Sequence, residues 1–205
     1  MLPLETEKRI ENPGLLENQF IQYLIAGNWP IDQSKSIAYE VLTDYRNVTG
    51  RTNAQFFTGQ FLQSQTNIRG SYVRPQGEHF VIYGIRIYYG EFTGEFNPQF
   101  VTWKKASYVE QNFVDGPIDG PFANCTYSIV NNGITAIKNM PFLMHDNTLV
   151  TDERGTLFLN QPICWAGMTE LNFNVRSNDP ANVFQGTLPE SNTLLRVDLV
   201  GIGLI

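Results

Sequence analysis

Glu78 and His79 stand side by side before the apolar run HFVIYGIRIYY, and this pair is the first candidate for metal or acid–base chemistry. His79 and His145 are the only histidines in the 205 residues. A cupin-type metal centre needs an H-x-H pair on one strand and a later histidine, so the sequence around His79 has one histidine where two are needed. We therefore interpret Glu78-His79 as the polar rim of a strand, and we expect no metal ion and no cofactor.

Other catalytic arrangements are equally sparse. The sequence has no G-x-S-x-G elbow. Glu91 and Glu95 flank a short FTG segment, where a turn with two solvated acids explains them better than a glycosidase pair. Asp115 and Asp119 offer oxygen ligands for calcium, but they lack D-x-D-x-D spacing, which favours simple turn chemistry. The sequence thus predicts a protein that is not an enzyme.

Composition and charge restrict the partners. The net charge is -6 with a pI near 4.9, and only Lys8-Arg9 and Lys104-Lys105 place two cations together. Binding to phosphates needs clustered lysine and arginine, so we expect no sequence-specific nucleic-acid binding. Charged residues make up only 17% of the chain, and asparagine and glutamine supply much of its polar surface. Such a surface carries little self-repulsion and suits packing against other proteins.

The two cysteines and the first residues bear on the compartment. Cys125 and Cys164 are too few for a disulfide framework, so buried free thiols are expected. The first residues are charged and polar and have no apolar core of a signal peptide, and no run approaches the length of a membrane span.

One helix is well marked between two prolines. Asn12 is the expected N-cap and Pro13 the first helical residue, and the apolar spacing predicts a helix from Pro13 to Ala26. Gly27 suits the C-terminal cap and Pro30 blocks continuation.

Large apolar residues cover a wide face of this helix. The face must be buried on the chain's own domain, which is favoured, or on a neighbouring subunit. The candidates for a subunit interface are Leu16, Phe20, Leu24 and Ile25.

Short strand-like runs follow Pro30. They are rich in β-branched and aromatic residues and are spaced too closely for helices between them, which predicts an antiparallel sandwich or barrel. In the run after His79, strict alternation places Val81, Tyr83 and Ile85 on one face. Because both faces of this run are largely apolar, we expect both to be covered, with Tyr83 and Ile85 in the core.

The last strand-like run, LLRVDLVGIGLI, alternates more clearly. Leu195, Val197 and Leu199 are expected to face inward, and Arg196 and Asp198 are expected to face out.

The domain organisation follows from these elements. Residues 1–30 form an N-terminal arm and helix, and residues 31–205 form one β domain. Two Asp-Gly-Pro tripeptides make a rigid surface connection, so a possible internal division is placed near residues 115–121.

The sequence also resembles a known protein family. The segment FFTGQFLQSQTNIRGSYVRPQGEHFVIYGIRIYYG, the Pro/Gly-rich middle and the closing TLLRVDLVGIGLI are similar to jelly-roll capsid proteins of small icosahedral bacteriophages. The similarity is to the single-stranded-DNA and lipid-containing phages of aquatic bacteria, and it spans residues 36–205.

The resemblance implies an all-β antiparallel jelly roll of two four-stranded sheets, with no catalytic residues to carry over. The length favours a single barrel over a compact pair of barrels. It implies a virion structural protein, either the major capsid protein or a vertex or minor one. The partners would be copies of itself and other capsid proteins, with an internal membrane left open, and assembly would occur in the host cytoplasm.

An alternative from another class is a glycan- or receptor-binding β-sandwich of a phage fibre or spike. Its signal would be tryptophan and tyrosine on one surface, for which Trp29, Trp103 and Trp165 are the candidates.

Overall fold

The computed structural model describes residues 13–29, 36–58, 66–68, 72–94, 101–106, 109–112, 116–119, 122, 124–146, 155–178, 183–184 and 190–204. Within these ranges the chain has one α-helix, a short 3-10 helix and eleven strands. They are, in order, α2 (Pro13–Ala26), β1 (Ile37–Asn47), β2 (Asn53–Phe56), β3 (Phe80–Phe92), β4 (Lys104–Lys105), β5 (Val109–Asn112), β6 (Gly116–Asp119), β7 (Cys125–Asn131), β8 (Ile134–Pro141), η3 (Phe142–Asp146), β9 (Leu157–Trp165), β10 (Leu171–Ser177) and β11 (Asn192–Leu204).

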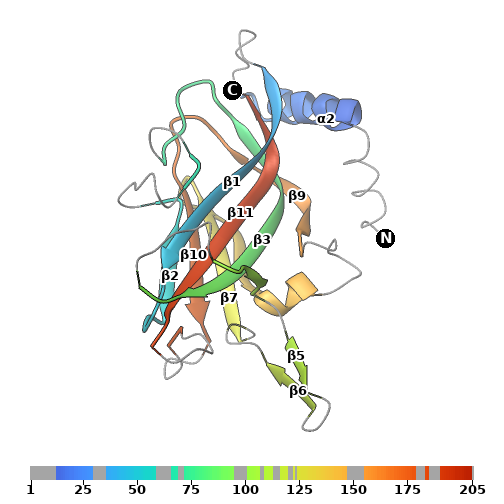
Figure 1. Ribbon diagram of the computed structural model, residues 1–205. Coiled ribbons are helices and arrows are strands. Elements are labelled where there is room, and N and C mark those ends of the chain that lie inside the picture. Colours follow the sequence, from blue (N-terminus) through green and yellow to red (C-terminus); the bar gives the residue numbers. More distant parts are fainter. Residues whose placement is uncertain are drawn as a thin grey trace.

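Two antiparallel sheets form the body of the protein (Figure 1). Sheet A has the order β1-β11-β3-β4, and β9 also pairs with β3. Sheet B has the order β2-β10-β7-β8, and β5 and β6 form a separate two-stranded ribbon. The predicted all-β antiparallel sandwich is confirmed. Strands from both sides of residues 115–121 occur in each sheet.

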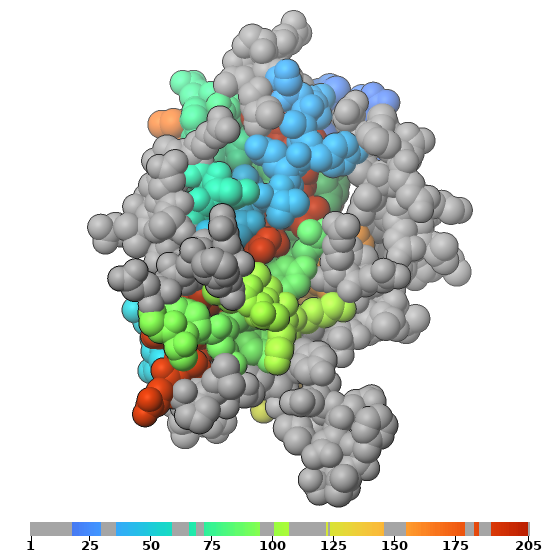
Figure 2. Space-filling view, in the orientation of Figure 1, coloured from blue at the N-terminus to red at the C-terminus, as the bar shows by residue number. Residues whose placement is uncertain are grey.

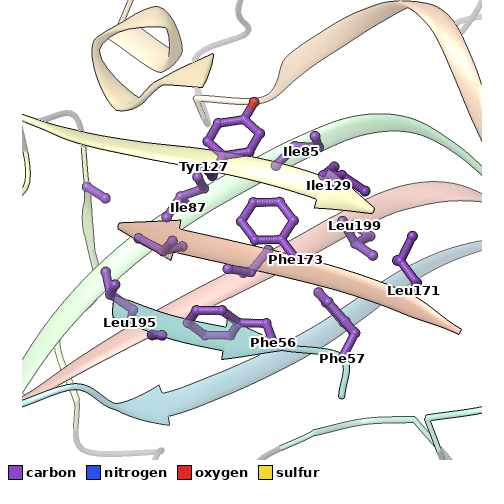
Figure 3. Close-up of a cluster of buried hydrophobic side chains, with 14 of the residues drawn as sticks. Phe56, Phe57, Ile85, Ile87, Tyr127, Ile129, Leu171, Phe173, Leu195 and Leu199 are labelled. Carbon is purple, nitrogen blue, oxygen red and sulfur yellow. The ribbon is translucent and has the colours of Figure 1, made fainter. Parts of the chain in front are cut away.

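Aromatic and aliphatic side chains from both sheets fill the space between them (Figure 3). Phe173 on β10 lies at the centre, stacked on Tyr127 with ring centroids 4.8 Å apart and edge-on to Phe56 at 6.2 Å. From sheet A, Ile85 and Leu199 reach into the same core. Alternate residues of β10 are buried, as expected for a strand with one face on a core.

A bulge in β3 changes which face its side chains occupy. Val200 of β11 pairs with Gly84 and Gly201 pairs with Ile82, so Tyr83 is an extra residue on β3. The strict alternation expected from the sequence is therefore wrong across this position. Ile85 lies in the core between the sheets, whereas Tyr83 is half-buried on the outer face. There it packs against a second apolar cluster that includes Phe20 and Leu24 of helix α2, which we call the helix cluster.

The helix bounds predicted from the sequence are confirmed. The helix ends in a Schellman-type turn, in which the N–H of Trp29 donates to the carbonyl of Leu24 and that of Asn28 donates to Ile25. The left-handed residue is Asn28, with φ 54°, and Gly27 precedes it. Asn12, the expected N-cap, lies outside the described residues.

Two connections show how local sequence shapes the edges. Asn132 and Gly133 both have positive φ and join β7 to β8 as a type I′ hairpin. The Asp-Gly-Pro segment, expected to be a rigid connection, instead contributes β6. Its proline is tolerated because the β5–β6 ribbon lies outside both main sheets, where Pro117 pairs with Gln111.

A buried carboxylate ties β1 to the segment after β2. Asp44 is fully buried and accepts hydrogen bonds from the Phe57 N–H at 2.8 Å, the Tyr72 hydroxyl at 3.1 Å and Arg46 at 3.1 Å. Burial raises the pKa of Asp44, and these three donors act against that rise. Phe57 has φ 59°, a costly conformation for a bulky residue, and its bond to Asp44 helps to hold it there.

We predict that Ile85→Ala lowers the free energy of unfolding by about 2–5 kcal/mol, because it empties a fully buried site between the sheets. Urea unfolding followed by circular dichroism measures this change. Ile134→Ala is the control, since Ile134 is 72% exposed. A loss in Ile85→Ala no larger than in the control would contradict the sandwich core.

Candidate interaction surfaces

Helix α2 packs on the outer face of sheet A. Phe20 and Leu24 are fully buried against Val81 of β3 and Ile202 of β11, in a cluster separate from the core between the sheets. The Tyr23 hydroxyl donates to the carbonyl of Pro162 at 3.0 Å and adds a polar tie to β9. The outer face of β3, expected to be covered, is therefore covered in part by the chain's own helix.

The four interface candidates are placed differently by this docking. Phe20 and Leu24 are already covered within one chain, and Ile25 is 54% exposed. The side chain of Leu16 lies outside the described residues. Among the described members of the set, Ile25 is thus the one available to a partner in this arrangement, and its role in an interface stays a prediction.

Both cysteines are buried free thiols, as predicted. Cys125 lies in the core between the sheets and Cys164 lies under helix α2. Burial raises the pKa of each thiol to about 12, so neither is a reactive thiolate at neutral pH.

His79 lies at the strand entrance, as expected, but it is buried and not an exposed rim. Its Nδ1 accepts a hydrogen bond from the Gly167 N–H at 3.3 Å, and its ring lies 5.8 Å from that of Trp29. Its carbonyl accepts from the Leu204 N–H. His79 therefore joins the start of β3 to the end of β11 and to the residues after the helix.

His145 lies at a different place, in η3 against the core. Its Nδ1 lies 3.2 Å from the Gly155 carbonyl and its Nε2 lies 3.2 Å from the Tyr127 hydroxyl. A neutral ring that donates from Nδ1 and accepts at Nε2 satisfies both partners. Burial lowers the pKa of His145 to about 4. Among the described residues, no group of three or more metal-ligating side chains comes together.

The half of sheet A's outer face that lies beyond the helix cluster carries cations and aromatic rings. Cross-strand pairing aligns Thr43, Asp198 and Arg86 in one row, and Tyr45, Arg196 and Tyr88 in the next. Lys105 pairs with Tyr88 and extends the second row. We call the half-buried residues of this surface the Arg196 face: Tyr45, Arg86, Tyr88, Trp103, Lys105 and Arg196.

Arg196 is held rigidly at the centre of this face. Its guanidinium donates to both oxygens of Asp198, at 2.8 and 2.9 Å, and the Thr43 hydroxyl donates to the same carboxylate at 2.8 Å. The guanidinium carbon lies 5.6 Å from the Tyr88 ring and 5.8 Å from the Trp103 ring. The side chain of Asp198 is only 2% exposed, while that of Arg196 is 30% exposed. The face therefore presents its cations to solvent and hides its carboxylate.

Gly90 leaves the space in which Trp103 packs on this face. A Cβ atom at Gly90 would clash with Val101 Cγ1 and would lie 3.2 Å from Trp103 Cε3. Any side chain there would displace both residues. Trp103 also lies 6.1 Å from the Tyr45 ring.

The outer face of sheet B has a different chemistry. Its central row contains Gln55, Asn174 and Ser128 from three neighbouring strands. Asn139 of β8 continues the row, because its N–H donates to the Ser128 hydroxyl. This row consists of amides and hydroxyls, which both donate and accept hydrogen bonds, and the exposed Arg176 lies beside it on β10.

The sequence indicated that Arg196 and Asp198 face outward, but it did not predict which residues of other strands lie beside them on the Arg196 face. A signal was present, since Thr43-x-Tyr45, Arg86-x-Tyr88 and Arg196-x-Asp198 each place two polar or aromatic residues on one face of a strand. Only the order β1-β11-β3 aligns these three pairs.

We predict that Phe20→Ala lowers the free energy of unfolding by about 3–5 kcal/mol, because Phe20 packs on its own sheet. Urea unfolding at a low protein concentration gives the value, and Ile25→Ala on the exposed side of the same helix is the matched control. If Phe20→Ala left stability unchanged and only reduced oligomer size, the helix would belong to a neighbouring subunit.

We predict that His145 makes the protein less stable as the pH falls from 6.5 towards about 4. In this window the unfolded chain binds a proton at His145 and the folded chain does not, so each pH unit costs about 1.4 kcal/mol. His145→Gln keeps a neutral donor and acceptor and should remove that part of the pH dependence. The difference between the two stability curves is the readout, because other titrating groups are common to both proteins. Parallel curves would show that His145 is not buried in the neutral form.

Compared with known proteins, the chain matches no protein-family model, and no curated protein matches it in sequence. None of the helices in the described ranges has the length and apolar character needed to cross a membrane. Inference about function therefore depends on the strand order and on the chemistry of the two outer faces.

Proposed function

We propose that the chain is a jelly-roll structural protein that assembles with copies of itself into an icosahedral virion shell. The observation that carries the proposal is the order of its eight principal strands. The roles of major and vertex or minor capsid protein both fit this proposal, which has no catalytic step.

The strand order is that of a long hairpin rolled into a sandwich. When β4 and the β5–β6 ribbon are set aside, the remaining strands pair first with eighth, second with seventh, third with sixth, and fourth with fifth. In this numbering, the strands of sheet A (β1-β11-β3-β9) have the order first-eighth-third-sixth. Those of sheet B (β2-β10-β7-β8) have the order second-seventh-fourth-fifth. A jelly roll has eight strands in two Greek keys, and the fold occurs in viral capsid proteins, lectins and cupins.

Side chains favour the first of these three classes. A cupin needs converging histidines, whereas His79 and His145 have different partners in different parts of the fold. The glycan-binding alternative had three tryptophan candidates, but Trp165 is fully buried and Trp29 packs in the helix cluster. Among the three candidates, Trp103 alone lies on an open sheet face.

The edges and faces of the sandwich suit controlled self-association. Strand β8 is exposed at an edge of sheet B, but register shifts, Lys138 and Pro141 oppose uncontrolled edge pairing. The outer face of sheet B can bond to a second copy of itself through the amides and hydroxyls of its central row, which supply both donors and acceptors. We propose this face as a contact between subunits.

We predict that the full-length protein forms discrete oligomers or closed particles as its concentration rises. Sedimentation velocity and negative-stain electron microscopy measure this directly. Gln55→Glu places a charge on strand β2, in the row of the sheet B face that also holds Asn174 and Ser128, and should shift assembly to higher concentration, whereas Gln22→Glu on the exposed side of α2 should not. A monomer at all concentrations that binds an oligosaccharide array would replace this proposal with the glycan-binding alternative.

A further inference from the structure

We propose that the Arg196 face binds single-stranded nucleic acid without sequence preference. This goes beyond the proposed shell function, and it concerns a surface that folding assembles from residues far apart in the sequence. In Figure 2, atoms of β1, β11, β3 and residues 101–106 lie at the surface on one side of the molecule.

The charge of this face is opposite to that of the chain. Arg86, Lys105 and Arg196 place three cations on it, and Asp198 is the only carboxylate among the described residues of the outer face of sheet A. The side chain that bears this carboxylate is 2% exposed, and the carboxylate already accepts bonds from Arg196 and Thr43. In a protein with a net charge of -6, this is a local site for a polyanion.

The aromatic rings narrow the class of polyanion. Tyr45, Tyr88 and Trp103 lie among the three cations, and a ligand that offered only phosphate or sulfate groups would leave them unused. Proteins that bind single strands combine a positive surface for the backbone with aromatic rings on which bases stack. A duplex hides its base faces, and a flat sheet face does not enter its grooves as a helix does.

The face is also built to keep its shape. Asp198 and Thr43 fix the guanidinium of Arg196, so this group is oriented before any ligand arrives. Gly90 lets Trp103 lie close to β3, beside Tyr45. Pre-organised side chains lose less conformational entropy on binding, which favours a binding surface over a mobile charged patch.

The test uses the full-length protein and a fluorescent oligothymidylate of about twenty nucleotides, longer than one expected binding site. We expect saturable binding by anisotropy, with a slope of about -2 in log K against log salt, since each of three phosphate contacts contributes about -0.7. Stacking on Trp103 should quench tryptophan fluorescence in the same titration.

Three variants locate the binding. Trp103→Leu should weaken binding about tenfold and abolish the quenching, because one base–aromatic stack is worth about 1–3 kcal/mol. Lys105→Gln should weaken binding and reduce the salt slope by about 0.7 while leaving the fold intact. Lys138→Gln removes the same charge from exposed strand β8 and should change neither quantity.

Any one of three results would contradict the proposal that the Arg196 face binds single-stranded nucleic acid. Equal binding of polyphosphate with no quenching would reduce the face to a non-specific charge patch. Salt-independent binding of a neutral oligosaccharide, lost in Trp103→Leu, would assign the face to glycans. No binding at low salt would leave it without a nucleic-acid role. Assembly is measured separately on the same samples, so a failure of the shell proposal is distinguishable from a failure of this one.

Discussion

The position of β11 between β1 and β3 is the constraint on which the rest of the structure depends. This strand pairs with β1 from Leu194 to Leu204 and with β3 from Asn192 to Gly203, so the last described segment of the chain completes the middle of sheet A. Its inward residues Leu195, Val197 and Leu199 close the core, and its outward residues serve the helix cluster and the Arg196 face. Because β1 and β11 lie far apart in the sequence, sheet A cannot be completed before these two strands meet.

The outer face of sheet A has two parts, an apolar part that packs against helix α2 and a polar part that is exposed to solvent. Near the end of β11, Ile202 and Leu204 are apolar and receive helix α2. Further back along the same strand, Arg196 and Asp198 are polar and form the centre of the Arg196 face. The bulge at Tyr83 changes the faces of β3 close to this division. One sheet can therefore hold its helix and present a charged surface without burying an unpaired charge.

The sequence predicted elements better than their arrangement. Local signals were sufficient for helix α2, since Pro13, Gly27 and Pro30 indicated its ends, and for strands such as β7 and β10 with β-branched and aromatic runs. The bulge at Tyr83 was missed because it depends on how Gly84 pairs with β11, which no local pattern records. The same limit applies to the sites. Arg196 and Asp198 were correctly directed outward, but their partners on β1 and β3 follow from the strand order alone.

Native-state hydrogen exchange tests the central position of β11 most directly. If β11 is inserted between β1 and β3, its amides near Val197 and Leu199 exchange only through global unfolding, with the same free energy as the centre of β3. The exposed edge strand β8 should exchange faster, through local opening. Exchange of β11 as fast as that of β8 would contradict its central position, and the rolled strand order that supports a shell function would fall with it.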